Sequence, residues 1–399
     1  MSLKKVSLFF ILFLLYVTSS AQIDKKDIVI GSSFIIHSKI MNDEREIQVF
    51  LPDSYVESNK NYPVLYILDG QRYFLHGVSL QKSFVEFRHS PEFIVVGISK
   101  KQSERNRNFS VNSKKYREFI EKETIALIDE KFRTSKKRLL FGWAYGGGFV
   151  VETMTTTPNL FDAYISASPF PLKNKIDKVD SLFIKNPKFD KLLYFTSGSD
   201  EGVVKDGTEK LNLLLSNKAP KTMNWTFREL KGEQHRSTPF TTLYHGIKEY
   251  FHFYPELQFS SLEDFTKAGG LNYVYNYYKK RAKQFGFSHE LTKWTMFTLT
   301  RNAMRANDYD QFEVFLNEFK KTKFLSEIRV SRACSIAEFY VKNKQYDKAI
   351  TLFSYLTEKH PNSERPLNGL GDTYKELKEE EKASLYYKKA KKVSENNSN

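Results

Sequence analysis

The fold is decided by the stretch RLLFGWAYGGGFVV at residues 138–151, which passes from an apolar run through a cluster of glycines into a second apolar run. Residues 138–141 predict a buried strand, and Phe149 begins a pattern typical of a helix. Gly142 and Gly146 flank position 144, as a sharp strand-to-helix turn requires, because only small residues fit beside its central position. The stretch therefore predicts a strand, a tight turn and a helix, with the side chain of Ala144 at the helix N-terminus.

Further strands and helices alternate on both sides of this stretch. The segment 116–132 has apolar residues at helical spacing. Four other segments read as strands, one alternating and three continuously apolar, at residues 46–51, 63–68, 93–98 and 192–195. Continuously apolar strands suit a parallel sheet that helices cover on both faces. Residues 23–255 are therefore predicted to form an α/β domain with a mostly parallel central sheet.

The remaining residues, 256–399, predict an all-α domain with repeats. A pattern of residue sizes repeats with a spacing of 34 positions. A residue of similar size stands 34 positions after each of Ile336, Ala337, Tyr340, Ala349 and Phe353. That period is typical of a tetratricopeptide repeat (TPR). We predict TPR-like units at about 330–363 and 364–397, with a degenerate unit upstream around 306–319. The alternative is an ordinary helical bundle whose spacing is coincidental.

Composition excludes several classes of protein. The chain has 399 residues, 40% of them hydrophobic and 27% charged, which excludes a disordered chain and a polytopic membrane protein. Its one cysteine, Cys334, excludes an intramolecular disulfide framework and a zinc site built from several cysteines. The net charge is +15, but no block of basic residues is interleaved with aromatic residues. We therefore expect a solvated basic surface and no nucleic-acid partner.

The first residues predict a secretory signal peptide. Lys4 and Lys5 precede the apolar run 6–17, and small residues follow at Ser19, Ser20 and Ala21. The run is shorter than the roughly 20 residues that span a bilayer. We predict cleavage after Ala21 and export to the periplasm or the medium, with no membrane anchor after cleavage.

Candidate site residues follow the strands in the chain order nucleophile, acid, histidine. Ala144 occupies the nucleophile position, and His235 lies in a loop before a predicted helix. Asp200 and Glu201 both follow the strand at 192–195. We favour Asp200, because a shorter side chain suits the turn after Gly198, and keep Glu201 as the alternative.

Backbone N–H groups are the candidates for an oxyanion hole, the pair of donors that stabilises a developing negative charge. Gly70 and Gln71 follow the strand at 63–68 in a turn that can face position 144. Tyr145 directly follows the nucleophile position, at the start of a helix. We predict these three residues as the oxyanion-hole donors.

These motifs, within residues 30 to 253, resemble the putative esterase family of α/β-hydrolases, which includes esterase D-like and enterochelin esterase-like proteins. The matching stretches are YPVLYILDGQRYF (62–74), FIVVGISKKQSERNRNFS (93–110), YREFIEKETIALIDEKFRTSKKRLLFGWAYGGG (116–148) and GEQHRSTPFTTLYHGI (232–247). The resemblance implies an ester-hydrolase ancestry, a serine nucleophile, and no metal or organic cofactor. It also implies a small-molecule ester or acyl ligand.

The chain departs from the family at the nucleophile, where it has Ala144 in place of serine. Three hypotheses follow. In the first, the protein is a catalytically silent relative that binds a ligand or a partner. In the second, it is an active serine esterase whose native serine has been replaced by Ala144. In the third, it is a TPR-based interaction protein with the hydrolase domain as scaffold. Helical repeats commonly present a concave surface to a protein or peptide, which is the partner expected for the repeats.

Overall fold

The computed structural model describes residues 25–99, 102–320 and 322–398, which divide into two compact units. The sheet unit comprises the described residues up to Ser83 together with Glu92–Gly246. The helical unit comprises Phe84–Pro91 and the residues from Ile247 onward. The division therefore falls within a helix that ends at Tyr250, a few residues before the predicted boundary at 255. The predicted signal peptide, residues 1–21, lies outside the described residues.

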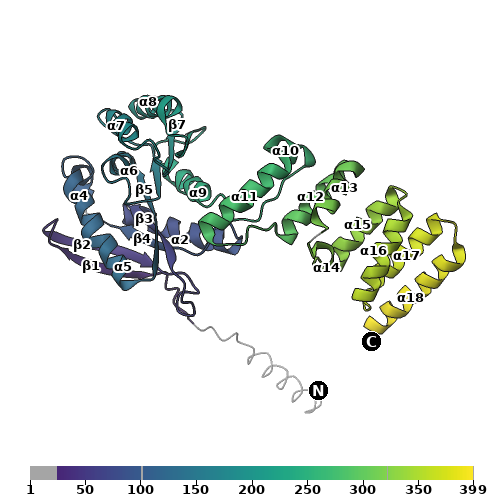
Figure 1. The fold of residues 1–399 in the computed structure, drawn as a ribbon. Coiled ribbons are helices and arrows are strands. Elements are labelled where there is room, and N and C mark those ends of the chain that lie inside the picture. Colours follow the sequence, from purple (N-terminus) through teal and green to yellow (C-terminus); the bar gives the residue numbers. More distant parts are fainter. Residues whose placement is uncertain (1–24, 100–101, 321, 399) are drawn as a thin grey trace, which may run out of the picture. The chain divides into compact units, whose positions relative to one another are not determined.

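The sheet unit is built on one eight-stranded sheet (Figure 1). In chain order the strands are β1 (Ser32–Ser38), β2 (Asp43–Phe50), β3 (Tyr62–Leu68), β4 (Ile94–Ile98), β5 (Thr134–Trp143), β6 (Ala163–Ala167), β7 (Leu192–Gly198) and β8 (Asn224–Leu230). In space their order is β1-β2-β4-β3-β5-β6-β7-β8. Strand β2 is antiparallel to both of its neighbours, and all the other pairs are parallel. Because parallel strands end at the same edge, the segments after β3, β5, β7 and β8 meet there.

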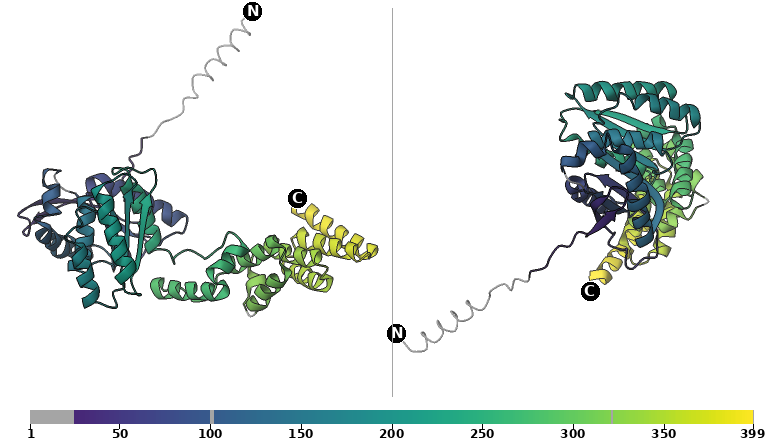
Figure 2. Two further views of the ribbon diagram at one scale, coloured as in Figure 1. Left: turned by 90° about the horizontal axis from the view of Figure 1, so that it is seen from above. Right: turned by 90° about the vertical axis from the view of Figure 1, so that its left-hand side faces the viewer.

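Helices cover both faces of this sheet (Figure 2). They are α2 (Gly70–Glu86), α3 (Arg105–Asn108), α4 (Ser113–Phe119), α5 (Ala126–Lys131), α6 (Tyr145–Thr156), α7 (Ile176–Lys185), α8 (Val203–Lys218) and α9 (Thr238–Tyr250). A short 3-10 helix η1 (Gln102–Glu104) precedes α3, and a π-helical segment η2 (Ile120–Ile125) joins α4 to α5. The helix predicted at 116–132 is thus one helical stretch interrupted by η2. The expected fold class, a mostly parallel sheet between helices, is confirmed.

Strand β3 shows why its sequence is continuously apolar. Successive side chains of a strand point to opposite faces of the sheet. Val64 and Tyr66 join the core cluster that contains Phe149 of α6. Ile67 points to the other face, where it lies against Gly77 of α2. All of these side chains are buried, so neither face of the strand can be polar.

The helical unit consists of successive helices with a core of its own (Figure 2). Its helices are α10 (Leu262–Ala268), α11 (Gly270–Phe285), α12 (Lys293–Ala306), α13 (Tyr309–Phe319), α14 (Phe324–Glu327), α15 (Val330–Lys342), α16 (Tyr346–Lys359), α17 (Glu364–Glu376) and α18 (Glu380–Ser398). The pairs α15–α16 and α17–α18 coincide with the two predicted units. The segment predicted as degenerate, 306–319, contains α13, the second helix of an earlier pair that begins with α12.

No helix among the described residues combines the length and the apolar character that crossing a bilayer requires.

Candidate active site

The turn between β5 and α6 holds Ala144 in a strained backbone conformation. Its φ of 55° and ψ of −117° lie in a region that residues with a side chain rarely adopt. Backbone hydrogen bonds fix the turn on both sides. The N–H of Ala144 donates to Ala167 O at 2.9 Å, and its carbonyl accepts from Gly148 N at 2.8 Å and Phe170 N at 3.0 Å. The predicted tight turn is present, with the Ala144 methyl group at its centre.

The glycines around Ala144 are required by close backbone approaches. A Cβ on Gly142 would lie 2.5 Å from the carbonyl oxygen of Gly146, and one on Gly147 would lie 2.8 Å from that of Ala167. Real Cβ atoms do not approach a carbonyl oxygen so closely. The glycine-rich sequence therefore follows from the sharpness of the turn.

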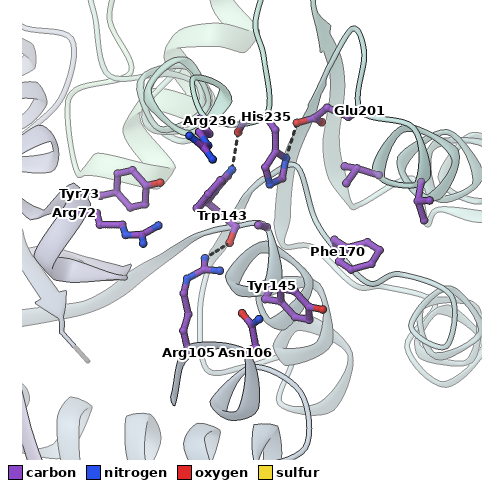
Figure 3. A pocket seen from close by; sticks show the side chains of 13 residues that line it. Arg72, Tyr73, Arg105, Asn106, Trp143, Tyr145, Phe170, Glu201, His235 and Arg236 are labelled. Atoms are coloured by element: carbon purple, nitrogen blue, oxygen red, sulfur yellow. Dashed lines mark hydrogen bonds and ion pairs between the residues drawn. The ribbon is translucent and has the colours of Figure 1, made fainter. Parts of the chain in front are cut away.

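A carboxylate and an imidazole meet at the same edge of the sheet. Nδ1 of His235, in the loop after β8, lies 2.8 Å from Oε1 of Glu201, which follows β7 (Figure 3). Because an ionised carboxylate only accepts, this bond places the proton of a neutral His235 on Nδ1 and leaves Nε2 as the basic nitrogen. This is the acid–histidine arrangement of a hydrolytic triad.

The acid in contact with His235 is Glu201, whereas the sequence analysis favoured Asp200. The Glu201 side chain is 1% exposed, and Asp200 lies exposed on the turn. The longer side chain folds back toward its own strand, where Oε2 accepts from Gly198 N at 2.8 Å. The argument from side-chain length was therefore wrong, because reaching back from this turn needs the extra methylene of glutamate.

Three donors surround the Glu201 carboxylate. Besides His235 and Gly198 N, the hydroxyl of Ser168 donates to Oε1 at 2.7 Å. Burial by itself raises the pKa of Glu201, but the hydrogen bonds from His235, Ser168 and Gly198 outweigh it and lower the pKa below its ordinary value. Glu201 is therefore held as a carboxylate, the form that orients and stabilises a histidine.

Trp143 connects the turn at Ala144 to the loop that carries His235. Its indole Nε1 donates to the carbonyl of His235 at 2.8 Å, and the two ring centres lie 4.9 Å apart (Figure 3). The sequence analysis did not assign this role. A tryptophan directly before the central position of the turn was the available signal, but its partner is 92 residues away in the chain.

A buried ion pair fixes the segment after β3. The guanidinium of Arg105 donates to the Asp69 carboxylate, with a shortest distance of 2.7 Å, and to the carbonyl of Trp143 at 2.9 Å. Asp69 is fully buried and Arg105 is 6% exposed. The pair joins the β3 turn to the end of β5, so it positions one side of the candidate site relative to the other.

The predicted oxyanion-hole residues have different surroundings. Tyr145 lines the pocket beside Ala144, whereas Arg72 and Tyr73, in the first turn of α2, line it on the side of β3. Gly70 is packed against β4, where a Cβ would lie 2.6 Å from the carbonyl carbon of Gly97. Packing therefore accounts for the glycine at position 70. The assignment of Gly70, Gln71 and Tyr145 as oxyanion-hole donors stays a prediction.

The pocket over Ala144 has a volume of about 820 Å³. Its lining is aromatic and basic, with the residues Arg72, Tyr73, Arg105, Asn106, Trp143, Ala144, Tyr145, Phe170, Glu201, Val203, Val204, His235 and Arg236 (Figure 3). The described part of the chain contains no cluster of three or more metal-ligating side chains. The pocket therefore has room for a ligand, and the Ala144 methyl group and the His235 imidazole both line it.

The mostly parallel sheet, the strained turn after β5 and the acid–histidine pair after β7 and β8 define an α/β-hydrolase. The particular family follows from comparison with known sequences. The family model described as Putative esterase matches residues 38–262, more than half of the chain, and the chain belongs to that family. A tetratricopeptide repeat model matches residues 365–397, which lie within the second of the two predicted repeats.

Similar proteins agree with this family. The ferri-bacillibactin esterase BesA of Bacillus subtilis (strain 168) is 28% identical over 182 residues, which are 36% of this chain and 63% of BesA. The match thus spans less than two thirds of that relative.

Two solved structures share the fold. An IroE-like serine hydrolase from Shewanella oneidensis superimposes with a TM-score of 0.54 at 22% identity, covering 72% of this chain and 98% of the hydrolase. An uncharacterised protein from Capnocytophaga ochracea gives a TM-score of 0.58 at 16% identity and covers 90% of this chain and 93% of its own.

Proposed function

We propose that the sheet unit binds a siderophore-type ester and holds it without hydrolysing it. The observation that carries this proposal is the strained turn at Ala144, kept beside a formed Glu201–His235 pair. A backbone in this conformation costs on the order of 1–3 kcal/mol. A site that combines this geometry with a pocket, and has no oxygen atom at the centre of its turn, is suited to recognising an ester and not to cleaving it.

The missing hydroxyl group accounts for the proposed lack of turnover. In a working triad the histidine takes the proton of the serine while its oxygen attacks the ester carbonyl. The Ala144 methyl group has neither an oxygen to attack with nor a proton to give. Loss of the serine alone costs about 10⁶ in kcat in the well-studied hydrolase subtilisin. We therefore expect turnover about a millionfold below that of a relative with the serine in place.

The charge of the pocket supports an anionic ligand. Three arginines line it, while Glu201 bonds to His235 and Arg105 is paired with Asp69. Arg72 and Arg236 line the same pocket and add to its positive charge. The relative BesA is named for its action on ferri-bacillibactin, the iron complex of a siderophore. We propose a ferri-siderophore ester as the ligand, with Tyr73, Trp143 and Phe170 as its aromatic contacts.

The helical unit is proposed to bind a protein partner, since a tetratricopeptide model matches its last two helices and such repeats present extended binding surfaces. We also propose that the chain is exported and cleaved after Ala21. The mass of the protein recovered from the periplasm or the medium tests cleavage, because a mature chain would begin at Gln22.

One experiment tests both the proposed ligand and the proposed lack of ester cleavage. Ferri-bacillibactin is titrated into the mature protein with intrinsic fluorescence as the readout, and ester cleavage is followed by chromatography. For the unaltered chain we expect saturable binding and no cleavage. Ala144→Ser should cleave the ester, and Ala144→Ser/His235→Ala should not. Rapid cleavage by the unaltered chain would show that the silent interpretation is wrong, and absence of binding by every variant would exclude this ligand.

The same series separates the other two hypotheses. If Ala144 replaces a native serine, Ala144→Ser should turn over at rates comparable with active members of the family, and the unaltered chain should trap the ester. If the sheet unit is only a scaffold, neither chain should bind or cleave esters. Partner recovery by the full chain should then be unaffected by substitutions in the pocket.

A further inference from the structure

The helical unit carries three arginines that lie together without a carboxylate. Arg301 and Arg305 lie on α12, and Arg332 lies on α15, which packs against α12. We call these three residues the arginine cluster. None of the ion pairs among the described residues includes any of them. The next arginine in this layer of first helices, Arg365 of α17, is paired with Glu338 of α15.

An aromatic platform supports the cluster. The guanidinium carbon of Arg332 lies 4.7 Å from the ring centre of Trp294 and 5.1 Å from that of Phe297. That of Arg301 lies 5.7 Å and 5.9 Å from the same two rings. Stacking on aromatic faces is a usual setting for arginine, and it fixes the guanidinium planes while leaving their N–H edges available.

The cluster is electrostatically unfavourable in the free protein. Burial and the like charges of Arg305 and Arg332 all lower the pKa of Arg301. The Nε of Arg301 is shielded from solvent and has no hydrogen-bond partner within the described chain. An anion among the three side chains would relieve the repulsion and supply the missing acceptor.

We propose that the arginine cluster binds an acidic segment of a partner protein, with its carboxylates on the guanidinium groups and an apolar side chain on the Trp294 ring. The proposal rests on, and makes specific, the protein-binding role given above to the helical unit. Arginine matches the planar, two-oxygen geometry of a carboxylate. The first helices α12, α15 and α17 form one layer of the repeats, which offers a continuous surface for an extended chain.

A nucleic acid fits this surface less well. Beyond the cluster, Arg365 of α17 is neutralised by Glu338 at 2.9 Å, so the unpaired positive charge does not extend along this layer of helices. The cluster is also compact, with three charges on two helices, whereas a nucleic-acid surface needs a basic stripe. A short acidic peptide is therefore the better match in both charge and size.

The test uses the full chain and a fluorescein-labelled peptide rich in Glu and Leu, with its Gln-for-Glu counterpart as the control probe. Fluorescence anisotropy should show binding of the Glu peptide only, weakening as salt is added. Arg305→Gln and Arg332→Gln should each weaken binding about tenfold, the value of one charge-assisted hydrogen bond. Lys388→Gln, which removes the same charge from the exposed surface of α18, should leave binding unchanged.

Thermal unfolding separates binding from folding. Arg305 is exposed and its one described interaction is repulsion with Arg301, so Arg305→Gln should not lower the melting temperature of the helical unit. Absence of Glu-peptide binding, or equal binding by Arg305→Gln and the unaltered chain, would overturn the proposal. Cluster-dependent binding of a single-stranded oligonucleotide without binding of the peptide would also overturn it. Failure here leaves ferri-bacillibactin binding by the sheet unit untouched, since that has its own readout.

Discussion

At Ala144 the backbone adopts φ and ψ values that any residue with a Cβ reaches only under strain. In a working hydrolase, that strain presents the nucleophile to the substrate. In this chain the three backbone hydrogen bonds of Ala144 hold the same conformation around a methyl group. The strain therefore has a cost in stability, although the side chain that it presents carries no hydroxyl group.

Replacing Ala144 with glycine should therefore stabilise the sheet unit. Glycine adopts positive φ without a steric penalty, so we expect Ala144→Gly to raise the free energy of unfolding by about 1 kcal/mol. Hydrogen exchange of the full chain measures this at the amides of β5 and β6. Ala126→Gly in helix α5 is the matched control and should lose about 1 kcal/mol. A loss of stability in Ala144→Gly would contradict the assignment of strain.

Glu201 gives the sheet unit a pH dependence of known sign. Its pKa is lowered in the folded state, so the stabilisation is fully present above the unfolded-state value of about 4.3 and is lost as pH falls through the lower folded value. On acidification, the free energy of unfolding should therefore fall less in Glu201→Gln than in the unaltered chain. Denaturant titration at several pH values measures this. Asp200→Asn, on the exposed neighbour, should behave like the unaltered chain. Identical acid profiles for all three proteins would count against the proposed contacts of Glu201.

The acid–histidine pair can be tested by activity once a nucleophile is supplied. In the Ala144→Ser background, Glu201→Gln should lower kcat by about 10²–10⁴, because an amide can stabilise the wrong tautomer of His235. Asp200→Asn in the same background should leave kcat within about twofold, since Asp200 lies exposed beside the pair. A larger loss from Asp200→Asn than from Glu201→Gln would reverse the assignment of the acid.

At the scale of the element, glycines set how closely neighbouring helices pack in the repeats. A Cβ on Gly369 of α17 would overlap the ring of Phe353 of α16, and Phe353 is fully buried. A Cβ on Gly371 would lie 2.5 Å from the ring of Tyr387 of α18. At both of these crossings, α16 with α17 and α17 with α18, a glycine therefore lies directly against a large ring.

Gly369→Ala should therefore destabilise the helical unit by about 1–3 kcal/mol through overpacking, although alanine is the better helix former. Gly207→Ala in α8 is the control, because its Cβ would make an ordinary contact at 3.4 Å from Leu172. That substitution should stabilise the sheet unit by up to about 1 kcal/mol. Calorimetry of the full chain measures both, and an unchanged helical transition in Gly369→Ala would contradict the tight crossing.

At the scale of the whole molecule, the two units have separate hydrophobic cores. A ligand that binds only one of the two folded units stabilises that unit by mass action. We expect ferri-bacillibactin to raise the unfolding temperature of the sheet unit equally in the unaltered chain and in Arg305→Gln. The acidic peptide should in turn bind His235→Ala as it binds the unaltered chain. Loss of both binding activities from one substitution would show that the sites are coupled.

The fold class was predictable from patterns of neighbouring residues, and the same patterns predicted a site at position 144. Continuous apolar strands, the glycine-flanked position 144 and the constant 34-residue offset are local patterns, and local sterics and burial dictate them. The chain order predicted Ala144 at the nucleophile position and His235 as the loop histidine, and the resemblance to the family implied a serine in place of Ala144.

Which side chains meet could not be predicted from such patterns. The choice between Asp200 and Glu201 depended on which carboxylate could fold back to Gly198 N and His235. The bond from Trp143 to the carbonyl of His235 and the ion pair between Arg105 and Asp69 join residues far apart in the chain. The arginine cluster is likewise formed by the packing of α12 on α15. Such contacts depend on the relative placement of packed elements, which no short-range pattern of residues encodes.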